Sequence, residues 1–326
     1  MYGRLNLFGT QAALIFGSLL ALGAAIATSA MADSESYAEV QQFSADGSPH
    51  FPAANRKTNR LYVSDVGAGT VTMFNAKTGD KLAETATGAG AHTVMVDVKK
   101  NLVYVTNRGA NTLSILDGST NAKLVDIPVG SLPHGLDLPS DCDCAFVSNT
   151  GSNDVTLVDT KTRSVRKTIP AGMGPWGVAV DSPRRQLFTA NTYEGSVSRI
   201  DIRSGETLAK IITGGRPWNI KVASTGRTYA TDEAGGVVHV MENDAVIATV
   251  PVGPAPHGLV LDEEEGIAFV AVTGANAVAI VDLATNTVRQ HLTVGTGPTA
   301  ISIGKGGRVY VANQAGGSIS VLRERD

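Results

Sequence analysis

The chain has 326 residues, of which 43% are hydrophobic and 17% are charged, with 36 glycines and a formal net charge of −3. This composition excludes a wholly disordered chain, and the small negative charge provides no global field for binding a polyanion. Two cysteines cannot build the scaffold of a disulfide-rich fold, whereas the glycine content predicts many turns.

The N-terminal segment 1–32 is typical of a secretory signal peptide. Its most apolar stretch is Ala12–Ala27, and Arg4 is the only charged residue before Asp33. Ala30-Met31-Ala32 supplies the small residues that a cleavage site requires. The alternative is an uncleaved membrane anchor, although no basic cluster follows the apolar stretch. We expect cleavage after Ala32 and a periplasmic or secreted mature protein with no stable membrane span.

One short strand motif recurs seven times in the rest of the chain. Each copy carries one aromatic residue, and these are Tyr62, Tyr104, Phe146, Phe188, Tyr229, Phe269 and Tyr310. The steps between them are 40 to 42 residues long. Each complete copy contains four strand-like pieces separated by Gly, Asn, Asp and Thr, as hairpin turns require. The sequence therefore predicts a single all-β domain over residues 33–326, a seven-bladed β-propeller of four-stranded blades.

The strand order within each copy, A to D, predicts its placement in a blade. The A pieces are small and apolar, which suits a crowded inner ring, and the D pieces are the most polar, which suits an outer edge. The aromatic residues of the B pieces are expected between neighbouring blades. The last copy ends at Asp326 without a D piece, whereas a spare strand lies at Tyr37–Phe43. We expect this N-terminal strand to complete the seventh blade and close the ring.

The second copy contains the tetrapeptide Tyr104-Val105-Thr106-Asn107, which opens an Asn-x-Gly-x-Asn loop. Gly-x-x-Pro-His turns occur as well, for example at Gly130–His134. With these motifs the chain resembles the YVTN-type β-propeller repeat family over Tyr37–Leu322. The resemblance implies an exported seven-bladed propeller. It indicates no single activity, because the same fold hosts many functions.

The D–A connections lead into the innermost strands and should surround the mouth of the central channel. Their aligned positions hold His50, His92, His134, Trp176, Trp218, His257 and Thr299. One interpretation is structural, with a repeated Pro-His turn and tryptophans that plug the channel. A second is a metal site in which the four histidines bind copper, zinc or iron, because imidazole is the commonest metal ligand.

A third interpretation is a ligand-binding face. Trp176 and Trp218 belong to adjacent copies, and Arg216, Tyr193 and Arg108 occupy loops of the same face. Aromatic and arginine side chains together can stack on bases or sugars, and the family resemblance permits single-stranded DNA binding through the tryptophan pair. The lack of a Lys/Arg cluster argues against nucleic acid. We predict no catalytic residue, because the sequence has no nucleophile elbow, Walker loop or paired-cysteine metal motif.

Cys142 and Cys144 lie in the A–B turn of the third copy, on the face opposite the histidines. Export favours oxidation, but residues two apart on a strand are far apart for an unstrained disulfide, so a disulfide and two thiols both stay open.

From these observations we expect a monomeric binding or scaffold protein that holds a small molecule or a protein partner on the loop face at the channel mouth. The first alternative is a metal-dependent enzyme or metal-binding protein that uses the histidines. The second is single-stranded DNA binding.

Overall fold

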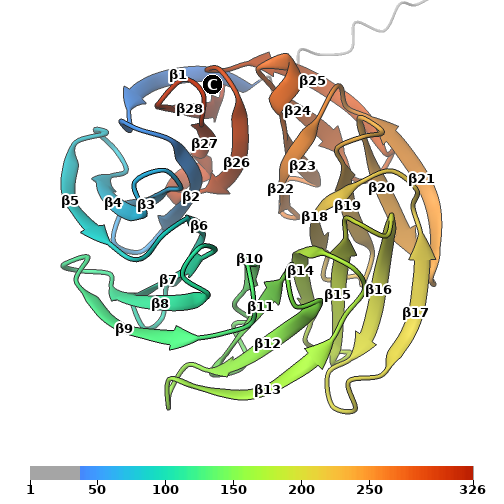
Figure 1. The fold of residues 1–326 in the computed structure, drawn as a ribbon. Helices are drawn as coiled ribbons and strands as arrows, with labels where there is room; N and C mark the ends of the chain where they lie inside the picture. The colour runs from blue at the N-terminus through green and yellow to red at the C-terminus, as the bar shows by residue number, and fades with distance from the viewer. Residues whose placement is uncertain (1–36, 326) are drawn as a thin grey trace, which may run out of the picture. The chain divides into compact units, whose positions relative to one another are not determined.

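The computed structural model describes residues 37–325, which form seven four-stranded antiparallel sheets set as blades around a ring (Figure 1). This confirms the predicted seven-bladed β-propeller. The expected signal peptide at 1–32 lies outside the described residues. Between residues 37 and 325 the only helical elements are two short 3₁₀ turns, η1 (Thr273–Ala275) and η2 (Lys305–Gly307). No helix of that part of the chain is long and apolar enough to cross a membrane.

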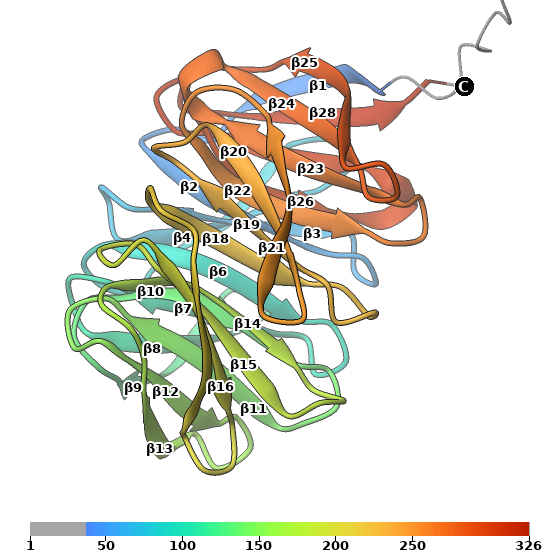
Figure 2. The same cartoon turned by 90° about the vertical axis from the view of Figure 1, so that its right-hand side faces the viewer.

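Each blade is a simple meander in which strands A to D follow one another outward from the ring axis (Figure 1). In the side view, the N-terminal strand lies among the strands from the C-terminal end of the chain (Figure 2). The A strands are β2 (Pro49–Asn55), β6 (Ala91–Asp97), β10 (Pro133–Asp137), β14 (Pro175–Asp181), β18 (Pro217–Val222), β22 (Pro256–Asp262) and β26 (Pro298–Ile303). The B strands are β3 (Arg60–Asp65), β7 (Leu102–Asn107), β11 (Cys144–Asn149), β15 (Gln186–Asn191), β19 (Thr228–Asp232), β23 (Ile267–Val272) and β27 (Val309–Asn313). The C strands are β4 (Thr70–Asn75), β8 (Thr112–Asp117), β12 (Asp154–Asp159), β16 (Ser196–Asp201), β20 (Val237–Glu242), β24 (Ala277–Asp282) and β28 (Ser318–Glu324). The D strands are β5 (Lys81–Ala86), β9 (Lys123–Pro128), β13 (Ser164–Pro170), β17 (Thr207–Ile212), β21 (Ala245–Pro251), β25 (Thr287–Thr293) and β1 (Tyr37–Ser44).

The N-terminal strand closes the ring, as predicted. β1 pairs antiparallel with β28, and the register runs from Tyr37 opposite Glu324 to Ser44 opposite Ser318. The seventh blade therefore has the order β1-β28-β27-β26, with strands from both ends of the chain. Without β1, the edge of β28 would present unpaired backbone groups to solvent.

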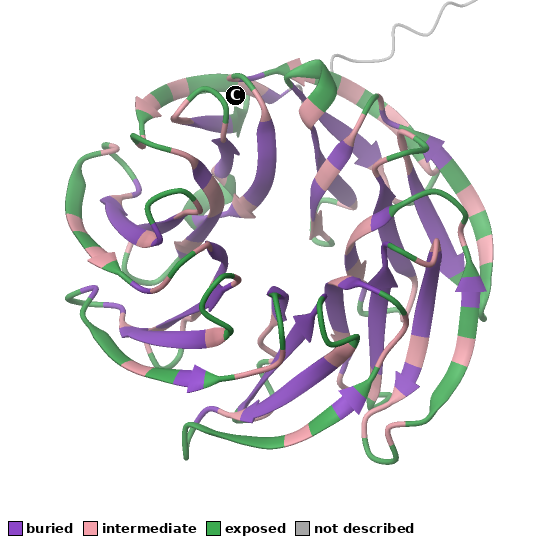
Figure 3. Cartoon of the chain, in the orientation of Figure 1, coloured by how far each residue is buried: buried purple, intermediate pink, exposed green. Residues whose placement is uncertain are grey.

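The core is divided among the interfaces between blades. The seven predicted aromatic residues of the B strands are all at most 5% exposed. Tyr104, for example, packs with Leu136 and Ala145 of the next blade. Figure 3 shows that the inner strands are mostly buried, whereas the outer strands alternate between exposed and covered residues. Because each blade buries its faces only against its neighbours, its stability depends on its interfaces with them.

The structure resolves the cysteine alternatives in favour of oxidation. Cys142 and Cys144 form a disulfide, and their Cα atoms lie 5.3 Å apart. The turn between β10 and β11 brings the two sulfur atoms together, which a regular strand would not.

Candidate functional site: the axial ring stack and its loop face

Hydroxyl groups of one blade fix the backbone of the next at the channel mouth. Four B-strand hydroxyls donate to the carbonyl oxygens of the D–A position: Ser64 to His92, Thr106 to His134, Ser148 to Trp176, and Thr231 to His257. These bonds use only the backbone of the accepting residue, so any side chain would satisfy them. The repeated turn is therefore structural, whereas the choice of histidine and tryptophan requires a separate explanation.

The side chains at this position form a continuous stack of rings around the axis. The ring centroids of His50 and His92 lie 3.9 Å apart, as do those of His92 and His134. His134 lies 4.4 Å from Trp176, and the two tryptophans are 3.4 Å apart. His257 stacks on Trp218 at 4.4 Å with an interplanar angle of 3°. Thr299 occupies the seventh position and donates a hydrogen bond to the His50 carbonyl. Six of the seven blades thus contribute one ring each.

The rings fill the centre of the propeller. The cavity that they line has a volume of only about 30 Å³, which is room for one water molecule. Small-molecule sites usually measure about 300–1,000 Å³. A ligand of that size therefore cannot enter the channel at this level and has to lie over the mouth.

Burial keeps the stacked histidines neutral. Desolvation, assisted by the neighbouring His257, lowers the pKa of His50 to about 3. The pKa values of His92 and His134 are also held well below 6.5, first by burial and then by the surrounding imidazoles and the Arg108 guanidinium. Burial lowers the pKa of His257 too, although the Glu233 carboxylate opposes the shift. A protonated imidazole in this stack would be a desolvated charge beside other bases.

The structure does not assemble the four histidines into a metal site. Among residues 37–325, no group of three or more His, Cys, Asp or Glu side chains could hold a metal ion. The reason is geometric, since the imidazoles meet ring against ring and Trp176 and Trp218 separate His257 from His134. A metal ligand set instead requires ring nitrogens that converge on one point. The copper, zinc or iron interpretation therefore stays a prediction.

The two predicted arginines lie beside the stack. The Nε atom of Arg108 is buried and has no hydrogen-bond partner among the described residues. Arg216 is exposed; its guanidinium lies over the Trp218 ring, 5.9 Å from the centroid, and its Nη1 is 2.9 Å from Glu233 Oε2. Glu233 Oε1 in turn lies 3.7 Å from Nε2 of His257. A polar group consisting of Arg216, Glu233 and His257 therefore borders the stack.

Glu233 is the site residue that the sequence analysis missed. It directly follows the B strand, at the position that Arg108 occupies in the second blade. In the third, fourth and sixth blades this position holds a threonine whose hydroxyl donates to the next proline carbonyl, as Thr150, Thr192 and Thr273 do. Aligning that position would have singled out Arg108 and Glu233 as charged replacements for a structural threonine.

Tyr193 lies on the same face but outside the stack. It is 58% exposed, and its ring lies so close to Gly174 that a Cβ atom there would collide with it. Two further apolar side chains project from neighbouring D–A loops, Met173 at 55% and Leu132 at 38% exposure. We call Leu132, Met173 and Tyr193 the loop-face patch. It belongs to the third and fourth blades, on the side of the mouth where Trp176 lies.

A family model described as YNCE-like beta-propeller matches residues 100–324. The chain belongs to the YNCE-like β-propeller family. The match runs from the A–B turn of the second blade to β28 of the seventh and includes the D–A positions from His134 to Thr299. It agrees with the YVTN-type resemblance of the repeats, and it assigns no activity to the stack. No curated protein matches the chain.

Solved structures share the fold of this family member. One is the hydrazine synthase of Kuenenia stuttgartiensis, with a TM-score of 0.77, 19% identity, and coverage of 85% of this chain and 95% of that one. Another is a streptogramin B lyase, with a TM-score of 0.75, 15% identity, and coverage of 89% of this chain and 98% of that one. At these identities the likeness concerns the fold alone.

Proposed function

We propose that the protein is an exported binding protein that holds a protein partner on the loop face at the channel mouth. The observation that carries this proposal is a set of buried polar atoms at the stack. Trp176 Nε1, His50 Nδ1 and Arg108 Nε have no hydrogen-bond partner among the described residues. A buried polar group without a partner costs about 1–3 kcal/mol and therefore requires an explanation, which a bound partner would provide.

The size of the site favours a protein over a small molecule. The cavity of about 30 Å³ admits one small polar group, and the remaining contact has to come from the rim. The loop-face patch provides exposed apolar area at that rim, and apolar and aromatic anchors surrounded by polar groups are typical of protein interfaces. Arg216 and Glu233 add one charge of each sign beside the mouth.

The small negative net charge and the lack of a Lys/Arg cluster in the sequence disfavour nucleic acid as the partner. The enzymes among the structural neighbours share too little sequence to carry their activities over. Export is expected from segment 1–32, so the partner should be sought outside the cytoplasm.

Co-purification from the native extracytoplasmic compartment tests the proposal. The test variant replaces Leu132, Met173 and Tyr193 with alanine. The matched control replaces three D-strand residues of similar exposure, Leu124, Leu208 and Ile247, which are 42%, 45% and 49% exposed. We expect a protein that the wild type and the control retain and that the loop-face variant loses at least about tenfold. Equal retention by the two variants, or no retained protein at all, would contradict the proposal.

A further inference from the structure

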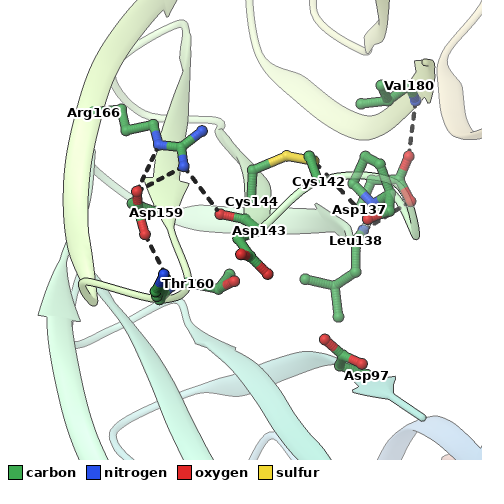
Figure 4. Close-up of a disulfide and its surroundings, with 12 residues drawn as sticks. Asp97, Asp137, Leu138, Cys142, Asp143, Cys144, Asp159, Thr160, Arg166 and Val180 are labelled. Atoms are coloured by element: carbon green, nitrogen blue, oxygen red, sulfur yellow. Dashed lines mark hydrogen bonds and ion pairs between the residues drawn. A yellow bond between two sulfur atoms is a disulfide. The ribbon is translucent and has the colours of Figure 1, made fainter. Parts of the chain in front are cut away.

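A second site lies on the opposite face, between the second and third blades. The A–B turns of these blades line a cavity of about 370 Å³, which is within the range of small-molecule sites. The turn after β6 contributes Asp97 to Lys100, and the turn before β11 contributes Leu138 to Cys144. The Cys142–Cys144 disulfide is part of its wall, as Figure 4 shows with the neighbouring aspartates.

The disulfide is suited to exchange rather than to holding the fold. It bridges residues only two apart, and a loop that short constrains the unfolded chain far less than the long loops of structural disulfides. Its two sulfur atoms also differ in access. Both cysteines line the cavity and pack against the cluster of Phe146, but Cys144 is only 6% exposed whereas Cys142 is half-buried. An attacking thiol would therefore reach Cys142 first.

Noncovalent contacts hold this turn independently of the disulfide. Lys100 Nζ lies 2.6 Å from Asp143 Oδ1 and 3.4 Å from Asp97 Oδ2. Lys99 Nζ donates to the Ser140 carbonyl at 3.1 Å. The Arg166 guanidinium, which pairs with Asp159, also donates to the Asp143 carbonyl at 3.4 Å (Figure 4). Opening the disulfide would leave these contacts in place, so the turn can cycle between two redox states.

The cavity also contains a buried tyrosine hydroxyl that makes no hydrogen bond to a backbone carbonyl. In equivalent positions Tyr62 donates to the carbonyl of Gly118 and Tyr310 to that of Ala76, each across a blade interface. Tyr104 is fully buried and lines the cavity, and its Oη lies near the Thr160 side chain without a hydrogen bond of 3.5 Å or less among the described residues. The same wall carries the ammonium groups of Lys99 and Lys100 and the carboxylate of Asp141. It therefore presents hydrogen-bond donors and charges of both signs to a ligand.

We propose that this cavity binds a low-molecular-weight thiol bearing amino and carboxylate groups, and that Cys142–Cys144 exchanges with it. The thiolate RS⁻ attacks Cys142 Sγ and forms a mixed disulfide, while the Cys142–Cys144 bond breaks and Cys144 leaves as a thiolate that takes up a proton. A second RS⁻ attacks the ligand sulfur of the mixed disulfide, releases RSSR and leaves Cys142 as a thiol after protonation. One protein disulfide is reduced while two RSH are oxidised to RSSR.

Reduction of the folded protein tests the site, with glutathione and the neutral thiol 2-mercaptoethanol compared at equal thiolate concentration. Alkylation and intact mass measure the dithiol, and circular dichroism verifies that the fold persists. We expect glutathione to act at least tenfold faster. A disulfide that resists both thiols until the protein unfolds, or equal rates for the two, would overturn the proposal.

Three variants locate the reaction. Cys144→Ser should trap glutathione on Cys142 when treated with oxidised glutathione, and Cys142→Ser should react at least tenfold more slowly. Tyr104→Phe should lower the ratio of the reduction rate with glutathione to that with 2-mercaptoethanol. Tyr62→Phe, which removes the hydroxyl that donates to the Gly118 carbonyl, should leave this ratio unchanged. A preference that Tyr104→Phe does not alter, or equal trapping at both cysteines, would show that the thiol does not bind in this cavity.

Discussion

Lowering the pH from 7 to 5 is expected to destabilise the propeller through His92 and His134. Burial holds both pKa values well below 6.5 in the folded protein, whereas in the unfolded chain each imidazole binds a proton below about pH 6.5. The unfolded state then takes up more protons, so stability that is present above this pH is lost as the pH falls. About 1.5 pH units below 6.5, each histidine lowers the free energy of unfolding by about 2 kcal/mol. For the pair this is about 4 kcal/mol, out of about 5–15 kcal/mol for a typical domain.

Urea unfolding at pH 7, 6 and 5 measures this effect, with His134→Phe as the comparison because phenylalanine keeps a ring in the stack. Between pH 7 and 5 the variant should lose about 2 kcal/mol less than the wild type. Carboxyl groups common to both proteins cancel in this difference, and Asp282, whose pKa is lowered to about 2 by backbone hydrogen bonds and Arg289, changes stability only at lower pH. Equal pH dependence of the two proteins would refute the claim that the buried imidazoles are neutral.

Three further predictions concern the ring and its loop face. Phe269→Ala removes a fully buried ring whose centroid lies 5.0 Å from that of Tyr37. It should lower the free energy of unfolding in urea by about 3–5 kcal/mol. A loss no larger than that of the exposed control Ile247→Ala would contradict the packing described. A chain that lacks residues 37–44 should unfold at a lower temperature, because β28 loses its partner strand. Adding the peptide 37–44 should raise the unfolding temperature part of the way back. Unchanged thermal unfolding would show that β1 does not close the ring. Gly174→Ala places a side chain at a φ of +62° and against the Tyr193 ring. It should lower the free energy of unfolding in urea by about 1–2 kcal/mol and weaken partner retention. Wild-type behaviour in both assays would contradict the close contact between position 174 and Tyr193.

The repeats made the fold predictable in detail. The regular spacing of Tyr104 and its six equivalents indicated both the number of blades and the residues between them. The missing D strand after Leu322 and the spare strand at Tyr37–Phe43 indicated the closure. These features are periodic, and strand periodicity is the most direct signal that a sequence carries about its structure.

The chemistry of the site was less predictable, because it depends on side-chain orientation. The sequence placed the four histidines at one position of the ring, but it could not distinguish imidazole nitrogens that converge from imidazole rings that pack against one another at a tilt. The roles of Glu233 and of the Tyr104 hydroxyl depend on departures from the pattern of the other blades. Such departures become visible only when the contacts of equivalent residues are compared.

Site-specific photocrosslinking tests the central claim, partner binding on the loop face, most directly. A photoreactive amino acid replaces Tyr193 in one protein and Ile247 in another, and both are irradiated in the native compartment. The two positions have similar exposure, 58% and 49%, but Ile247 lies in the outer strand β21. We predict a discrete protein adduct from position 193 that Trp176→Ala weakens, and none from position 247. No adduct from position 193, or the same adduct from both positions, would contradict the account.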